Sequence, residues 1–159
     1  MSEISAFHEA GHAFVAIYVG ARVQSITVDP DWDDGPKRSG DIRVEWPGDE
    51  FTEREYHEKS VLVALGGPVA EMIQSGEPFH PGIVPEWAAD WQEAWKSAAF
   101  LFTDEQKRLF YLEQTSVQLY RLLDRQDHWA ALSAIVDNLL AYETLEGDEV
   151  EDIVRGWLA

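Results

Sequence analysis

Small and apolar residues near the start of the chain recur with the period of an α-helix. They fall at spacings of three and four, at Ile4, Phe7, Gly11, Phe14, Val15 and Tyr18. Positions with this spacing share one face of a helix. Ser2 is a residue type that caps the start of a helix, and Gly20 is one that follows its end. The pattern therefore predicts a helix over residues 2–19.

The next segments have the character of β-strands. Residues 22–29 are rich in β-branched side chains, and residues 41–46 alternate so that Ile42, Val44 and Trp46 share one face. The stretch PDWDDGPKRSG (30–40) between them combines proline, glycine and aspartate, as loops do. We expect two strands of a small antiparallel sheet, joined by this loop.

Helical patterns resume after the second predicted strand. Thr52 and Glu55 form the spacing of a capping box, which opens a helix. Pro68 lies inside this helix, where it lacks an N–H and crowds the carbonyl group four residues earlier. We therefore expect the helix to kink or break near Ala64.

The C-terminal half reads as further helices. Pro85 suits the first turn of a helix that follows a loop, Thr103 with Gln106 repeats the capping pattern, and Asp127 is another cap signal. The stretch TLEGDE (144–149) is expected to be a turn before a short last helix. The expected helices run from 85 to about 102, from 103 to about 125 and over 128–143.

These elements predict a mainly α fold with a small antiparallel β-sheet near the N-terminus. A length of 159 residues suits one domain with a real core, and neither a linker nor a repeat interrupts the chain. We expect a single domain over residues 1–159.

Charge and composition exclude several classes of function. Acidic residues outnumber basic ones 30 to 12, so phosphate backbones and anionic lipid surfaces would repel the chain. The chain has no cysteine, so a bound metal must use histidine or carboxylate ligands. No apolar run reaches the length of a membrane span, and the first residues do not form a signal peptide. We expect a cytoplasmic protein that binds neither nucleic acid nor a membrane through this chain.

The segment FHEAGHAF (7–14) carries the candidate chemistry. His8 and His12 are four residues apart, so on a helix both imidazoles can reach one metal ion. Glu9 lies beside such an ion, where it can take a proton from a zinc-bound water. This is the metalloprotease interpretation of the H-E-x-x-H pattern. The alternative is a chance pattern, with the two histidines simply packed or solvated.

A catalytic zinc ion needs a third protein ligand, which residue spacing alone does not identify. The stripe of tryptophans at positions 87, 91 and 95 is more typical of a core than of a binding surface. Isolated histidines are usually solvated or hydrogen-bonded. His80 lies on the predicted loop before Asp90, so it is the one of them that could lie near zinc. The candidate ligands are His57, His80, His128, Glu71 and Asp90.

Six segments occur in the same order as in the peptidase domain of the FtsH family of ATP-dependent zinc metalloproteases. They are HEAGHA, ITVDP, SGDIRVEWPGDE, ALGGPVAEMI, ADWQEA and LLAYETLEGDEVEDIV, and they extend from residue 8 to residue 154. The chain resembles that domain over nearly its whole length. The resemblance implies the mainly helical fold of the FtsH peptidase domain and a hydrolase that requires zinc.

The resemblance also implies residue roles. His8 and His12 match the two zinc-binding histidines, and Glu9 matches the catalytic glutamate. Asp90 matches the aspartate that supplies the third zinc ligand. Glu71 matches an acidic position on the helix facing the site, where outer carboxylates commonly orient metal-bound histidines.

The strand residues Ile42, Arg43, Val44 and Glu45 match the family's strand beside the active-site cleft. Such an edge can hold an extended peptide through backbone hydrogen bonds, which suits broad specificity. The resemblance thus implies a zinc-dependent metalloendopeptidase that cleaves unfolded proteins or peptides.

The chain departs from the family pattern in ways that leave a second function open. The family carries an ATPase domain and membrane helices ahead of the peptidase domain, and neither is expected here, so a separate ATPase is a candidate partner. The approach to Asp90 reads IVPEWAAD, and the region after residue 102 is shorter than in the family. The alternative function is a non-catalytic FtsH-like module that binds a protein partner, with or without zinc.

Overall fold

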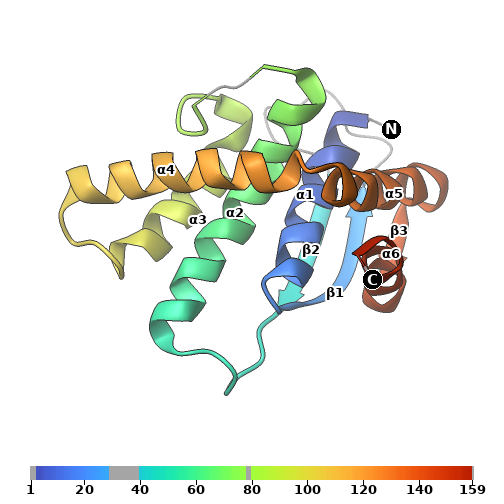
Figure 1. Ribbon diagram of the computed structural model, residues 1–159, viewed down its shortest axis with the longest axis horizontal. Coiled ribbons are helices and arrows are strands. Elements are labelled where there is room, and N and C mark those ends of the chain that lie inside the picture. The colour runs from blue at the N-terminus through green and yellow to red at the C-terminus, as the bar shows by residue number, and fades with distance from the viewer. Residues whose placement is uncertain (1–2, 29–39, 78–79, 159) are drawn as a thin grey trace.

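The structure is a computed structural model that describes residues 3–28, 40–77 and 80–158. The predicted cap at Ser2 and the predicted loop over residues 30–39 lie outside these residues. The described elements confirm the predicted class, a mainly helical fold with a small antiparallel sheet near the N-terminus (Figure 1). In chain order they are α1 (Glu3–Tyr18), β1 (Arg22–Val28), β2 (Gly40–Glu45), α2 (Glu53–Ser75), the 3₁₀-helix η1 (Pro85–Trp87), α3 (Ala88–Ala99), α4 (Glu105–Leu123), α5 (Gln126–Tyr142), β3 (Thr144–Glu146) and α6 (Gly147–Leu158).

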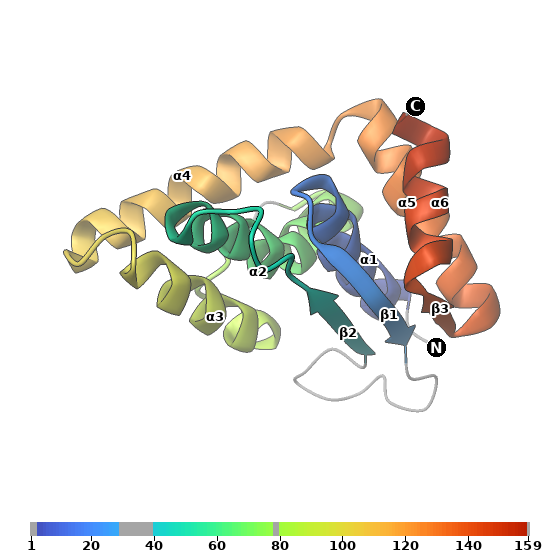
Figure 2. The same cartoon turned by 90° about the horizontal axis from the view of Figure 1, so that it is seen from below.

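Helix α1 forms the centre of the molecule, because every residue from Ser5 to Ala16 is buried. It contacts α2 along one side, α5 along another, and the strands β1 and β2. Figure 2 shows β1 and β2 running alongside α1, with α3 toward one end of the molecule and α5 and α6 at the other. The observed bounds of α1 agree with the predicted helix to within one residue at each end.

The sheet has three antiparallel strands in the order β2-β1-β3, of which the sequence predicted two. The predicted turn over residues 144–149 was wrong, because its first half is β3. Leu145 pairs with Ile26 of β1 and is 1% exposed, so the strand forms where a buried leucine meets a strand from the start of the chain. Three residues are too few to show a period of two in the sequence.

The helix predicted to kink or break near Ala64 does not break, since α2 runs from Glu53 to Ser75 without interruption and contains Pro68. A proline inside a helix costs about 3 kcal/mol through the lost hydrogen bond and the crowded carbonyl. Here Val61, Leu65 and Val69, which lie on both sides of Pro68 or next to it, are fully buried, and their packing offsets that cost. The predicted capping box at the start of α2 is confirmed, with both of its hydrogen bonds present.

Three predicted helix starts in the C-terminal half needed correction. Pro85 opens a single 3₁₀ turn, and α3 follows it. The cap of α4 is Asp104 and not Thr103, because the Asp104 carboxylate accepts from the backbone N–H groups of the second and third helical residues. Asp127 lies inside the first turn of α5 and does not precede it. Within the described residues, no helix is both long and apolar enough to cross a membrane.

Candidate metal centre

The metal centre is built where α1 and α2 cross at backbone distance. A Cβ atom placed on Gly11 would lie 2.3 Å from the Gly66 carbonyl oxygen, and one on Gly66 would lie 2.8 Å from the Gly11 carbonyl oxygen. Only residues without a side chain permit this approach. His8 and His12 share one face of α1 and lie on either side of Gly11 in the sequence. The close crossing at Gly11 therefore brings both imidazoles into contact with α2.

Gly67 provides the space that the imidazoles occupy. A Cβ atom there would lie 2.5 Å from Nε2 of His12 and 2.7 Å from Nε2 of His8. Real atoms do not approach so closely, so any side chain at position 67 would displace the two rings. Both glycines of the ALGGPVAE segment therefore shape the site. Gly66 allows the two helices to approach closely, and Gly67 leaves room for the two imidazole rings.

Three side chains from two helices converge at this point. Nε2 of His8 lies 3.1 Å from Nε2 of His12, and the Asp90 carboxylate oxygens lie 2.8 Å and 3.3 Å from these two nitrogens. Four ligands at 2.0–2.1 Å from a tetrahedral zinc ion would lie about 3.3 Å from one another. The two imidazoles and the carboxylate thus have the spacing and the chemistry that a zinc ion requires.

Hydrogen bonds at the far side of each ring fix which nitrogen faces the centre. Nδ1 of His12 lies 2.6 Å from the Val63 carbonyl oxygen, which can only accept, so the proton resides on Nδ1. Nδ1 of His8 lies 2.6 Å from Oε2 of Glu71. Both rings therefore donate through Nδ1, and each directs its Nε2 lone pair toward Asp90 and the shared centre when neutral.

The carboxylates also stabilise the protonated, positively charged forms of the buried histidines. Burial alone would lower the pKa of His8, but the hydrogen bonds to Asp90 and Glu71 raise it to about 9. Burial would lower the pKa of His12 too, and the charge of Asp90 raises it. Burial would raise the pKa of Asp90, whereas the two histidines hold it well below its usual range. A metal ion entering the site must therefore displace protons, which makes its binding depend on pH.

Glu9 is buried next to the histidines, with 5% of its surface exposed. Its negative charge contributes to the raised pKa of both His8 and His12, although it is not one of the three grouped ligands. This position beside the centre is the one that the sequence predicted for a general base.

Trp87 is a part of the site that the sequence prediction missed. It is 3% exposed, and its indole N–H donates to Oε2 of Glu71 over 2.8 Å. The tryptophan stripe correctly indicated core packing for Trp87, while Trp91 and Trp95 are half-buried against the core. The spacing of three between Trp87 and Asp90 was the available signal, because it places the indole one turn before the third predicted ligand.

The three remaining candidate histidines lie elsewhere. The ring of His57 stacks on Phe100 at 4.1 Å. The Nδ1–H of His128 donates to the Leu122 carbonyl oxygen over 2.8 Å. The ring of His80 lies 3.1 Å through Nε2 from Glu113. Among the described residues, the group able to hold a metal consists of His8, His12 and Asp90.

A cleft of about 370 Å³ opens beside the centre. His12 and Asp90 lie in its wall, and Ile42 and Val44 of β2 line it together with Trp46, Tyr56, Ser60, Val63, Ala64, Glu93 and Ser97. Arg43 and Glu45, the other predicted substrate-binding residues, alternate away from it and are exposed. Among the described strands β2 is an edge, since it pairs with β1 alone.

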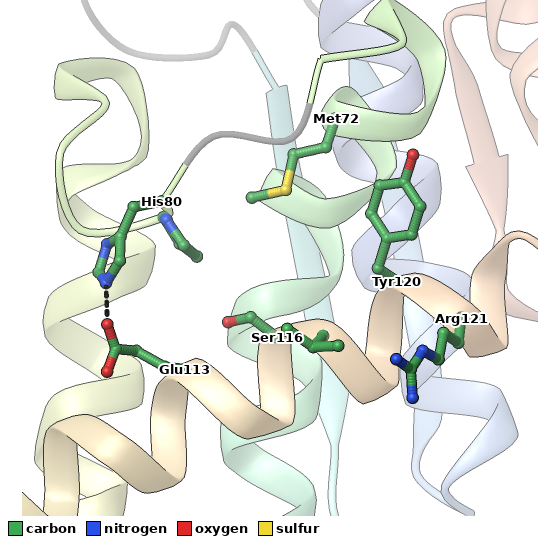
Figure 3. A pocket seen from close by; sticks show the side chains of 8 residues that line it. Met72, His80, Glu113, Ser116, Tyr120 and Arg121 are labelled. Carbon is green, nitrogen blue, oxygen red and sulfur yellow. Dashed lines mark hydrogen bonds and ion pairs between the residues drawn. The ribbon is translucent and has the colours of Figure 1, made fainter.

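A second cavity, of about 500 Å³, lies between the end of α2, the segment before η1, and α4. Figure 3 shows Met72 and Tyr120 on one side of it and the hydrogen-bonded pair of His80 and Glu113 on the other. The Gly82 N–H donates to Nδ1 of the same imidazole, so its Nε2–H donates to Glu113. This pair ties the segment before η1 to α4 and lies apart from the grouped metal ligands.

Comparison with known proteins agrees with this chemistry. Residues 4–73 match the model of a family described as Peptidase M50B-like. The matched residues run from α1 into α2 and include His8, Glu9, His12 and Glu71, but fewer than half of the 159 residues. A search of curated proteins found no match. The family match points to a metallopeptidase and does not single out the FtsH family.

Proposed function

We propose that this protein is a zinc-dependent metalloendopeptidase in which His8, His12 and Asp90 hold zinc and Glu9 is the general base. The observation that carries the proposal is the convergence of two Nε2 atoms and one carboxylate at the spacing of zinc ligands. When bound, zinc polarises a peptide carbonyl group and lowers the pKa of a coordinated water molecule to about 7. Two histidines and one carboxylate are a known ligand set for catalytic zinc.

Each residue has a distinct part in this mechanism. The Glu9 carboxylate accepts the proton that water loses as it attacks the peptide carbonyl, and then delivers a proton to the departing amine nitrogen. The Glu71 carboxylate keeps His8 oriented by accepting its Nδ1–H, and the Val63 carbonyl oxygen does the same for His12. Asp90 balances part of the metal's charge, which lets a buried site accept a dication.

The substrates that fit best are extended polypeptides. Among the described strands, the outer edge of β2 faces no further strand, so a peptide could add there as a strand. Ile42 and Val44 then direct their side chains into the cleft beside Asp90. Recognition of backbone groups favours unfolded proteins or flexible peptides over folded ones. The resemblance to the FtsH peptidase domain supports Asp90 as the third ligand, and it suggests that a separate ATPase delivers folded substrates.

The test is cleavage of casein, an unstructured protein, by the zinc-loaded chain. We expect Glu9→Gln to keep stoichiometric zinc and lose at least about a hundredfold in rate, because general-base catalysis contributes that much. Glu3→Gln, on the same helix but exposed, is the matched control and should cleave like the wild type. A chelator should abolish cleavage, and added zinc should restore it.

Two outcomes would count against the proposal. Full activity in Glu9→Gln would exclude this residue as the base. Stoichiometric zinc at His8 and His12 without cleavage of casein or of short peptides would favour the non-catalytic interaction module.

A further inference from the structure

One carboxylate oxygen at the metal centre accepts from two different elements. Oε2 of Glu71 lies 2.6 Å from Nδ1 of His8 and 2.8 Å from Nε1 of Trp87. All three side chains are buried, with 3% of His8, 6% of Glu71 and 3% of Trp87 exposed. Two hydrogen bonds to one buried oxygen fix the position of that oxygen far better than either bond alone.

Trp87 also belongs to the segment that carries the third proposed ligand. It is the last residue of η1, and α3 begins at the next residue and holds Asp90 in its first turn. The indole therefore connects the start of α3 to Glu71 on α2, and Glu71 connects to His8 on α1. Trp87 thus links two proposed ligands, His8 and Asp90, that come from different helices.

We propose that Trp87 is a positioning residue of the metal centre, a role that rests on the proposed function. Its indole N–H holds Oε2 of Glu71 in place to accept from His8, so that Nε2 of His8 points at the metal. Its attachment to Glu71 also sets the place of the turn that presents Asp90. The positioning depends on the hydrogen bond from the Trp87 indole N–H to Glu71, and not only on the space that the ring fills.

A purely structural role for Trp87 would have different consequences. If the ring only fills space, phenylalanine at position 87 would lower the melting temperature but leave the metal affinity of the folded protein unchanged. If the N–H positions Glu71, the metal affinity falls even where the protein remains fully folded. The two cases differ in metal affinity measured well below the melting temperature.

The experiment measures Zn²⁺ and Co²⁺ affinity by competition with a chromophoric chelator, and records the visible spectrum of the Co²⁺ form. We expect Trp87→Phe to weaken binding about tenfold, at the lower end of the 10–100-fold typical for outer partners of metal ligands. The Co²⁺ bands should also shift, because the orientation of His8 changes. Trp95→Phe removes an indole from α3, the helix that follows Trp87, without touching Glu71, and it should bind like the wild type.

A second variant keeps the protein's packing intact if phenylalanine proves too disruptive. The amino acid β-(3-benzothienyl)alanine has the shape of tryptophan with sulfur in place of the N–H, and at position 87 it should give the same loss. In a Glu71→Ala background, Trp87→Phe should change affinity by less than about twofold, because its point of action is gone.

Three results would overturn the inference. Wild-type affinity in both Trp87 variants would show that the N–H does not matter. Equal losses with and without Glu71 would show that Trp87 acts by another route. Failure of the wild-type chain to bind either metal would overturn the proposed function and this role together, whereas the first two results leave the proposed function standing.

Discussion

Two histidines that are buried to the same extent show what separates a metal site from a core position. His8 and His128 are equally buried, each with 3% of its surface exposed. His8 faces two carboxylates, from Asp90 and Glu71. His128 packs against the rings of Phe14 and Tyr18 on α1. Its Nδ1 lies 2.8 Å from a backbone carbonyl oxygen, and its Nε2 lies 4.0 Å from Asp127, which is at the surface.

Since His8 and His128 are equally buried, they differ in the side chains that surround each ring. Aromatic neighbours satisfy the apolar faces of His128 and give it no second or third ligand. The carboxylates around His8 are costly to bury as charges, and they are retained where a cation can neutralise them. Burial of a histidine therefore indicates packing, and burial together with a carboxylate and a second imidazole indicates a metal centre.

The largest effect on zinc affinity should come from removing one of the two histidine ligands, His8 or His12. We expect His8→Ala or His12→Ala to lower zinc affinity on the order of a thousandfold, because the coordinating nitrogen is lost. His128→Gln should retain wild-type affinity and show only a lower melting temperature. Isothermal titration with zinc measures the affinity of each variant. A comparable loss of affinity in His128→Gln would contradict the assignment of His128 to packing alone.

A slightly smaller effect is expected from closing the space beside the rings. Gly67→Ala places a methyl group where the two Nε2 atoms lie, so zinc affinity should fall by roughly a hundredfold and stability by about 1–3 kcal/mol. Gly48→Ala is the control, since a Cβ atom there meets nothing within 4 Å. Equal zinc binding by the two variants would mean that Gly67 does not shape the site.

The free energy of unfolding of the metal-free protein should depend on pH through His8. Because the pKa of His8 rises from 6.5 to about 9 on folding, its protonated form stabilises the fold. That stabilisation is full below pH 6.5 and is lost as the pH rises through 9, on the order of 3 kcal/mol. Asp90 acts in the opposite range, since its lowered pKa gives stability above about pH 3.8 that is lost on acidification.

Urea unfolding between pH 5 and pH 10, with the metal removed, measures this dependence. The wild type should lose stability toward pH 9, and His8→Gln should flatten the curve. An unchanged slope in His8→Gln would contradict the assigned origin of the stabilisation.

The smallest predicted effect concerns the cleft and not the metal. Val44 lines the cleft beside Asp90, whereas Arg43 points away from it. Val44→Ser should raise the KM for a peptide substrate about five- to tenfold through lost apolar contact, with little change in kcat. Arg43→Ser should change either constant less than about twofold. A larger effect of Arg43→Ser would place the substrate on the other face of the strand.

Local sequence patterns were sufficient to predict the helix with His8, Glu9 and His12, because a helix fixes which residues share a face. They were also sufficient for β1, which is rich in β-branched residues, and for β2, whose residues alternate. They could not identify β3, because its three residues form a strand only by pairing with β1 across more than a hundred positions.

The third ligand shows a different kind of limit. Asp90 is 78 positions from His12, and only the approach of α3 to the α1–α2 crossing brings it within 3.3 Å. Spacing left Glu71 and Asp90 as equal candidates, and resemblance to a family favoured Asp90. The roles of Trp87 and Gly67 depend on contacts between helices. Residue spacing places Trp87 one turn before Asp90, but it does not show the contact of Trp87 with Glu71.

Anomalous diffraction at the zinc edge from zinc-loaded crystals would show whether zinc binds at His8, His12 and Asp90. We predict a full-occupancy peak about 2.0–2.1 Å from Nε2 of both His8 and His12, with the Asp90 carboxylate completing the protein ligands. A peak at His128 or His80, or no peak between His8 and His12, would contradict it.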